Sequence, residues 1–346
     1  MQWVLAVVAA AALLQVHHDG GVRAATTTVD GRAVRYVIVP LDRVRVRVAL
    51  GDDRPGRTEL LARMASRHHA IAAINGGFFE AYTAGPIKNL IHTTVVDGTL
   101  VFKGDVGDEL YFDRDNNAAI DRVPLRIEGA LDGSYEYPNN WYAYWINRMP
   151  EGSADTVTIF TPDWGARTGL AGFQVQVSGG VVTAIAASSL PIPRDGYVVY
   201  VKGEETIARR LAIGRRVEYR VVRTDGDPSA SFFQSWEVIG GGPRLLTDGR
   251  VTIDPHGERF KDPKVWGNDA RSMVGISRDG RFLILAVSDG TLEDSAAIML
   301  RLGAYEAMNL DSNASSGLWF RGRYLREPGR LLNNALLILP PNEPAP

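Results

Sequence analysis

Two aspartates in the last third of the sequence follow segments that are expected to be strands. Asp289 comes just after the apolar run 282–287, and Asp311 comes just after residues 304–310. If these strands run parallel in one sheet, their carboxyl ends share an edge, which is where ligands bind in open α/β sheets. Two converging carboxylates suit glycosidic cleavage, one acting at the anomeric centre and the other handling a proton. The alternative is that each Asp only caps a turn.

Three further features near these strands are candidates for binding an anion or a sugar. Gly240, Gly241 and Gly242 follow a short expected strand, and backbone without side chains can approach a ligand closely or cradle a phosphate. A tight turn is the simpler explanation of the same triplet. Arg271 opens another expected strand, and Arg is a natural clamp for phosphate. Asn75 ends the short strand 70–74 and joins the two aspartates if that strand runs the same way.

A helix is expected between the two aspartates, and it would make the connection a βαβ crossover. Thr291 begins it in a pattern like a capping box, with Asp294 in the place of Glu, and Gly303 ends it. A second helix is expected from Thr58 to about Arg67. These are the only two helices that stand out.

Strands dominate the rest of the chain. Residues 44–48 alternate as a half-buried strand does. Asp-Gly pairs at 97–98, 195–196, 248–249 and 279–280 indicate hairpin turns. The fold class that follows is α+β, with mixed, largely antiparallel sheets, a few flanking helices and at least one βαβ crossover. Aromatic residues between 135 and 145 are interpreted as packing and loop structure, or alternatively as a sugar-stacking wall.

Composition limits the class of protein. The chain has 346 residues and a net charge of −2, so neither nucleic acid nor an anionic membrane is an expected partner. It has no cysteine, which excludes disulfides, thiolate metal sites and a cysteine nucleophile. Asp289 and Asp311 offer the hard oxygen ligands that suit Mg²⁺ or Ca²⁺, but no ligand spacing demands a metal. We therefore expect no cofactor, with a divalent cation left open.

The N-terminus resembles a secretory leader. An apolar run from Trp3 to Val16 has the length of a signal-peptide core, and small residues at 22 and 24 suit cleavage after Ala24. The alternative is a buried or membrane-anchoring helix. We expect residues 1–24 to be a signal peptide and 25–346 to be one exported domain, periplasmic, in the cell envelope or secreted, with no membrane span once the leader is removed.

Several stretches, in order, resemble the phosphodiester glycosidase family from about residue 70 to 340. The stretches are 73–79 (AINGGFF), 160–165 (FTPDWG), 240–243 (GGGP), 271–276 (RSMVGI), 309–311 (NLD), 314–318 (ASSGL), 328–330 (PGR) and 334–336 (NAL). Each is weak alone, and their shared order carries the resemblance. The family resemblance implies hydrolysis of a sugar-1-phosphodiester, with a glycosyl phosphodiester or an envelope glycan as the substrate.

The resemblance also implies roles for residues in the matching stretches. Asp311 and Asp289 are the expected catalytic carboxylates. The expected substrate and phosphate ligands are Arg271, Asn75, Gly76, Gly240, Gly241, Gly242 and Ser315. The sequence departs from the family after Asp311, where Ser312-Asn313-Ala314 replaces glycines; a positive φ is tolerable for Asn313 and harder for Ser312. That departure keeps open a second hypothesis, a non-catalytic glycan- or phosphate-binding protein with the same fold.

Overall fold

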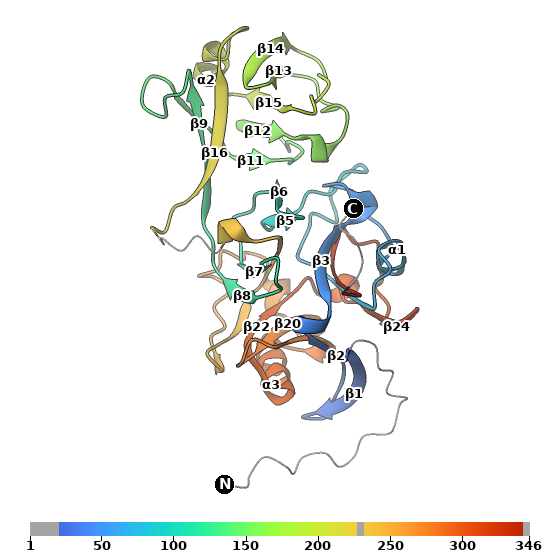
Figure 1. The fold of residues 1–346 in the computed structure, drawn as a ribbon. Coiled ribbons are helices and arrows are strands. Elements are labelled where there is room, and N and C mark those ends of the chain that lie inside the picture. Colours follow the sequence, from blue (N-terminus) through green and yellow to red (C-terminus); the bar gives the residue numbers. More distant parts are fainter. Residues whose placement is uncertain (1–20, 227–231, 342–346) are drawn as a thin grey trace.

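The computed structural model describes residues 21–226 and 232–341. They form a body of three sheets and an arm, residues 125–223, that projects from it (Figure 1). The sheets are almost entirely antiparallel and the helices are few, as the sequence predicts for a β-rich α+β fold. No helix in these two ranges is long and apolar enough to cross a membrane.

The first sheet of the body has seven strands and carries the segment that ends at Asp311. Its order is β1 (Arg23–Val29), β2 (Arg32–Pro40), β21 (Phe282–Gly290), β20 (Asp269–Ser277), β22 (Ala304–Asn309), β18 (Arg244–Thr247) and β19 (Arg250–Val251).

The other two sheets of the body have five strands each. One is ordered β24 (Arg323–Arg326), β23 (Leu318–Phe320), β4 (Ala72–Asn75), β25 (Asn334–Leu339) and β3 (Arg45–Leu50). The other is ordered β6 (Thr99–Phe102), β5 (Thr94–Val96), β17 (Glu237–Gly241), β7 (Asp108–Phe112) and β8 (Ala118–Asp121). One core, with side chains from all three sheets such as Val274, Leu336 and Phe112, holds the body together.

The arm has a core of its own. It contains the sheet β10 (Asn140–Ala143), β9 (Leu125–Leu131), β16 (Val217–Arg223) and a second sheet of β11 (Trp145–Ile146), β12 (Thr156–Phe160), β15 (Gly196–Lys202), β13 (Phe173–Ser178), β14 (Val181–Ala186), with the short helix α2 (Glu205–Arg210). Its buried side chains, including Ile127, Val175 and Val199, form a separate cluster. The arm of the single domain that the sequence predicts thus has a hydrophobic cluster separate from that of the body.

The two predicted helices are present. Helix α3 (Leu292–Leu302) has the Thr291–Asp294 capping box at its start and Gly303, with φ 94°, at its end. Helix α1 (Leu61–Arg67) begins three residues later than expected, because residues 58–60 do not join the helix. Apolar packing rather than a cap holds it: no side chain caps it, while Leu61 and Met64 are fully buried.

Helix α3 connects two parallel strands that are not neighbours. Strands β21 and β22 each pair antiparallel with β20, which lies between them, so they run in the same direction. The connection is a crossover around an inserted strand. Their carboxyl ends share an edge, as predicted, but they are two strand spacings apart, about 10 Å.

Other sequence-based expectations have mixed outcomes. The pairs 97–98, 248–249 and 279–280 form hairpin turns, whereas Gly196 begins β15 without one. Strand β3 is not half-buried: Val46 to Leu50 are all buried, because Val46 and Val48 pack in the common core while Ala49 packs in a second cluster with Leu61 of α1.

The predicted leader lies mostly outside the described residues, which begin at Gly21. Its predicted end, however, falls within the fold. Val22 is completely buried against the body core, and Arg23 and Ala24 pair with β2. Cleavage after Ala24 would remove this buried side chain from the fold.

Candidate active site

Asp311 lies two residues beyond β22, and the neighbouring sheets fix its main chain. Its N–H donates to the Gly76 carbonyl at 3.0 Å, and its carbonyl accepts from Asn75 Nδ2 at 2.7 Å. The side chain accepts a backbone hydrogen bond at one oxygen: the Ser312 N–H donates to Oδ1 at 2.8 Å. The fold therefore sets the position of Asp311 through its backbone and leaves the carboxylate available to a ligand.

Burial raises the pKa of Asp311 from 3.8 to about 6. The Ser315 hydroxyl, the bond from the Ser312 N–H and the positive charge of Arg330 lower it and offset only part of this effect. A carboxyl group with a pKa just below neutral can gain and lose a proton near physiological pH, which is the property of a general acid or base.

The Asp311 carboxylate faces a cavity of about 420 Å³, here called the Asp311 cavity. Its wall combines aromatic and cationic side chains. The residues that line it are Phe78, Phe79, Ala81, Tyr82, Ile91, Val106, Arg259, Phe260, Lys261, Asp262, Lys264, Val265, Asp311, Ser312, Asn313 and Arg330. Apolar walls with a few convergent polar groups are typical of small-molecule sites.

Four cations surround this cavity against two carboxylates. Arg259, Lys261 and Lys264 come from the segment before and within the short 3-10 helix η5 (Pro263–Trp266). Arg330 comes from the loop before β25; it donates to the Tyr82 hydroxyl at 2.6 Å and packs over the ring, 4.9 Å from its centroid. The excess of positive charge suits an anionic ligand such as a phosphate diester.

The aromatic residues of the cavity wall include packed rings and one exposed ring. Phe78 and Phe260 are in contact, with ring centroids 5.5 Å apart, and the buried His92 ring packs against both. Burial lowers the pKa of His92 to about 4, so it is neutral at pH 7. Tyr82 is 87% exposed and is the aromatic side chain at the mouth of the cavity. Aromatic faces of this kind suit the apolar face of a sugar ring.

Arg271 lies behind the wall rather than in it. It is completely buried, and its guanidinium donates to the carbonyls of Gly290 at 3.0 Å, Val265 at 2.7 Å and Gly267, with a longer bond to the Ser312 hydroxyl at 3.4 Å. It ties the η5 segment to the turn after Asp311. The geometry gives Arg271 a positioning role and does not bring it to the cavity lining.

Asn75 also positions the site. Its side chain is 1% exposed and all four of its hydrogen-bonding positions are used. Oδ1 accepts from the Ser272 hydroxyl at 2.6 Å and from the Gly317 N–H at 3.0 Å, and Nδ2 donates to the Gly76 and Asp311 carbonyls. The prediction that Asn75 lies beside Asp311 is confirmed. In the structure, however, Asn75 binds the Asp311 backbone and holds it in place.

The predicted glycines serve close packing. A Cβ at Gly76 would collide with the Asn334 amide and one at Gly240 with His92, while at Gly241 it would lie 2.8 Å from the Asn309 carbonyl. Gly242 has a φ of 127°, which disfavours side chains. None of Gly76, Gly240, Gly241 and Gly242 lines the Asp311 cavity. Their predicted contact with phosphate has no support in this geometry.

The structure does not bring the two predicted carboxylates together. The Asp289 side chain is 73% exposed and forms an ion pair with Arg326 at 2.8 Å. It is absent from the lining of the Asp311 cavity. The inserted strand β20 separates the strands that carry the two residues, which the sequence could not show. The second carboxylate that lines the cavity is Asp262.

The turn after Asp311 forms without glycines. Asn313 has a φ of 58°, and Ser312 is extended with φ −118° and ψ −171°. The Ser312 hydroxyl points inward and donates to the Leu310 carbonyl at 3.0 Å. Ser315, a predicted ligand, is 1% exposed and does not line the cavity, but its hydroxyl lies beside the Asp311 carboxyl and lowers its pKa.

Sequence reasoning missed most of the cavity wall. The sequence assigns no role to Arg330, although it lies in a matching stretch, and none to Tyr82 or the segment 259–264. The closely spaced cations in that segment are the signal that could have indicated it. The aromatic run 135–145 belongs to the arm and lines no part of the cavity; Trp141, for example, is in the arm core. Within the two described ranges, no group of three His, Asp or Glu side chains could hold a metal ion.

About half of the chain is similar in sequence to a known protein family. Residues 171–339 match the model of the phosphodiester glycosidase family. The predicted resemblance to phosphodiester glycosidases is confirmed. The match includes Asp311, Arg330 and the 259–264 segment, and it excludes Asn75. No curated protein has a sequence that matches this chain.

Two solved structures share the fold of this chain at low identity. A hypothetical protein from Synechocystis has a TM-score of 0.79 at 22% identity, over 92% of this chain and 62% of that one. The chain thus spans 62% of the length of that relative. A protein of Burkholderia pseudomallei K96243 that is thought to be exported has a TM-score of 0.70 at 20% identity, over 89% of this chain and 74% of that one. The zebrafish N-acetylglucosamine-1-phosphodiester alpha-N-acetylglucosaminidase catalytic domain has a TM-score of 0.48 at 16% identity, over 92% and 82% of the two chains.

Proposed function

We propose that this protein is a hydrolase that cleaves a glycosyl-1-phosphodiester bond in the Asp311 cavity. The observation that carries the proposal is the pairing of Asp311, whose pKa burial raises to about 6, with the cations on the same cavity wall. A carboxylate that can accept a proton near neutral pH and a cationic wall are the two requirements for this reaction. The match of residues 171–339 to phosphodiester glycosidases supports the same reaction class.

In the proposed reaction, a water oxygen bonds to the anomeric carbon and the bond from that carbon to the phosphate oxygen breaks. The phosphate monoester leaves with the electron pair, and the Asp311 carboxylate takes the proton that the water loses. A phosphate leaving group is a weak base and needs little protonation. It needs neutralisation of its charge, which Arg330, Lys261 and Lys264 supply from the cavity wall.

The sugar is proposed to lie against the aromatic side of the cavity. Phe260 and Tyr82 present apolar faces there. This assignment moves direct substrate contact away from Arg271, Asn75 and the glycines, which act by holding Asp311 and the η5 segment in place.

A second candidate function is non-catalytic binding of a glycan or phosphate, favoured by the loss of glycines after Asp311. The local geometry weighs against it. Asn313 adopts the left-handed conformation that a glycine would allow, and the Ser312 hydroxyl is engaged by the Leu310 carbonyl. The residues that replace the glycines therefore adopt the turn without an unfavourable φ at Ser312.

We also propose that the protein is exported and acts on a phosphodiester of the cell envelope or outside it. The apolar N-terminal run supports export. No metal is part of the proposed reaction, and a divalent cation remains to be tested by dialysis against a chelator.

The test is sugar release from a panel of sugar-1-phosphodiesters, including UDP-N-acetylglucosamine, by the purified protein. Asp311→Asn removes the proposed base and is expected to lower kcat by about 100-fold or more. Asp289→Asn is the matched control, because its exposed side chain lies outside the cavity, and it should retain most of the activity.

Three outcomes separate the hypotheses. Release that is lost in Asp311→Asn and kept in Asp289→Asn supports the proposal. Equal loss in both variants contradicts the assignment of Asp311 as the sole carboxylate base. Tight binding without release by the wild-type protein favours the binding function.

A further inference from the structure

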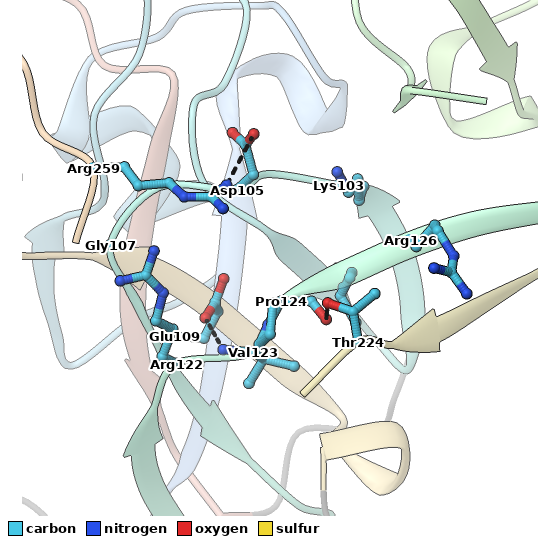
Figure 2. A pocket seen from close by; sticks show the side chains of 11 residues that line it. Lys103, Asp105, Gly107, Glu109, Arg122, Val123, Pro124, Arg126, Thr224 and Arg259 are labelled. Carbon is cyan, nitrogen blue, oxygen red and sulfur yellow. Dashed lines mark hydrogen bonds and ion pairs between the residues drawn. The ribbon is translucent and has the colours of Figure 1, made fainter. Parts of the chain in front are cut away.

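A second cavity, here called the junction pocket, lies where the arm joins the body (Figure 2). Its volume is about 300 Å³. The chain enters the arm through residues 123–126 and returns at Thr224, whose N–H donates to the Pro124 carbonyl at 2.9 Å. The body contributes Lys103, after β6, and Glu109, from β7. The pocket is thus formed by both parts of the molecule.

Four cations from three separate segments line the junction pocket: Lys103, Arg122, Arg126 and Arg259. Arg126 is engaged by the Glu128 carboxylate at 3.0 Å, which leaves the other three. Figure 2 shows Lys103, Arg122 and Arg259 around the pocket, each on a different stretch of chain. Three cations at one cavity repel one another, so their arrangement lowers the stability of the fold unless an anion is bound there.

The carboxylates of the pocket neutralise little of this charge. Asp105 forms a long ion pair with Arg259, at 3.7 Å. Glu109 is 2% exposed and accepts from the Val123 N–H at 3.0 Å, and burial raises its pKa well above the usual range. Lys103, Arg122 and Arg259 outnumber the two carboxyl groups that line the pocket, Asp105 and Glu109.

Lys103 and Arg122 have no carboxylate partner within ion-pair distance in the described part of the chain. Arg122 donates to the Gly257 carbonyl, and the Lys103 ammonium lies 5.4 Å from the centroid of the Trp145 ring. Burial lowers the pKa of Lys103, whereas the Asp105 carboxylate raises it. A partly buried ammonium without a counter-ion is destabilising unless an anion joins it.

The junction pocket adjoins the Asp311 cavity. Arg259 lines both, and the segment 105–107 separates them: Val106 faces the Asp311 cavity, while Asp105 and Gly107 face the junction pocket. The two cavities therefore share Arg259 and lie on either side of the segment 105–107.

We propose that the junction pocket binds a second phosphate of the substrate, on the side of the scissile phosphodiester away from the sugar. This inference rests on the proposed function and narrows the substrate class to glycosyl phosphodiesters whose leaving group carries a further phosphate. Two sources share this chemistry: a nucleoside diphosphate sugar, and an oligomer of sugar 1-phosphate units joined by phosphodiesters.

The experiment compares three substrates. N-acetylglucosamine 1-(methyl phosphate) has one phosphate, UDP-N-acetylglucosamine has two in direct linkage, and a phosphodiester-linked dimer of N-acetylglucosamine 1-phosphate has two separated by a sugar. The readout is the ratio of kcat/KM for each two-phosphate substrate to that for the one-phosphate substrate. In Arg122→Ala and Lys103→Ala this ratio is expected to fall by about tenfold or more, since each removes one charge-assisted contact.

The matched control is Arg301→Ala, which removes an exposed cation from α3, outside both cavities. A ratio that falls in the two pocket variants and not in this control supports the proposal. A fall for UDP-N-acetylglucosamine indicates a nucleoside diphosphate sugar as the substrate, and a fall for the dimer indicates an oligomer of sugar 1-phosphate units. If the wild type cleaves the substrates and neither ratio changes in Arg122→Ala or Lys103→Ala, the second-phosphate site is overturned and the proposed function stands.

Failure of the proposed function is recognised separately. If the wild type releases no sugar from any substrate, the binding of inorganic pyrophosphate is measured by calorimetry on the same proteins. Binding at least tenfold weaker in Arg122→Ala than in Arg301→Ala still supports an anion site in the junction pocket. Equal affinity in the two variants overturns it.

Discussion

Removing the charge of Asp311 should make the protein more stable at neutral pH while it stops the proposed reaction. The substitution is Asp311→Asn, which keeps the shape of the side chain and an oxygen that can accept from the Ser312 N–H. Because burial disfavours the ionised carboxylate in the folded protein, the neutral amide avoids that cost. Stability and activity are therefore expected to change in opposite directions.

The magnitude follows from the pKa of Asp311. Folding raises it from 3.8 to about 6, and a difference of about two pKa units corresponds to about 3 kcal/mol. As pH rises from 4 to 6, the unfolded chain loses this proton while the folded protein retains it. The folded state binds more protons in this window, so the free energy of unfolding of the wild type falls with rising pH. The variant escapes this decrease.

The assay is urea unfolding followed by tryptophan fluorescence at pH 4, 5, 6, 7 and 8. The free energy of unfolding of the variant should equal that of the wild type at pH 4. The difference between them should grow between pH 4 and 6, as the wild type loses stability, and reach up to about 3 kcal/mol at pH 7 and 8. Asp289→Asn, which removes an exposed ion-paired carboxylate, should change stability by less than about 1 kcal/mol. A difference for Asp311→Asn that is the same at every pH, or a less stable variant at pH 8, would refute the argument that burial dominates at Asp311.

Three further outcomes test the framework around the cavity. Arg330→Ala removes a charge that lowers the pKa of Asp311, so the acid limb of the kcat/KM profile should move to higher pH than its wild-type position near 6, and KM should rise. Arg271→Met leaves buried carbonyls without their donor and should lower the free energy of unfolding by about 3 kcal/mol or more in a urea titration; an effect on KM alone would instead indicate direct contact with the substrate. Gly77→Ala places a Cβ against the Gly240 carbonyl and should lower the melting temperature by at least about 5 °C, a result that an unstrained site would not give.

Local features of the fold were predictable where a short stretch of sequence contains the whole cause. Helix α3 is the best case. The residues that cap its start, Thr291 and Asp294, and the glycine that ends it are adjacent to the helix, and their geometry is as expected. Three of the four Asp-Gly turns are also where the sequence indicates them.

The candidate site was predictable in part. Asp311 and its neighbour Asn75 were correctly placed together, although 236 positions separate them. The pairing of Asp311 with Asp289 was wrong because strand β20 inserts between their strands, and β20 lies earlier in the chain. Strand order depends on contacts between distant segments, and no local pattern encodes it.

The roles of Arg271 and the glycines were misjudged for a different reason. Residue type indicates what a side chain can do, but not which partners it meets. Arg271 can clamp a phosphate, yet the carbonyls of Val265, Gly267 and Gly290 occupy its donors first. Glycines allow a ligand to approach the backbone, and in β17 they instead allow other parts of the chain, such as His92 and the Asn309 carbonyl, to approach it.

The contrast between the two aspartates explains why Asp311 is the better candidate for catalysis. Asp289 is exposed and satisfied by Arg326, so its charge costs the fold little. Asp311 is held in position by bonds to its backbone, while its carboxylate receives a single backbone N–H and no direct cation. A fold that only needed a polar residue there could use the amide at lower cost. That the chain retains an acid with a pKa of about 6 in a cationic, aromatic cavity is what a proton-transfer site requires and what a structural turn does not.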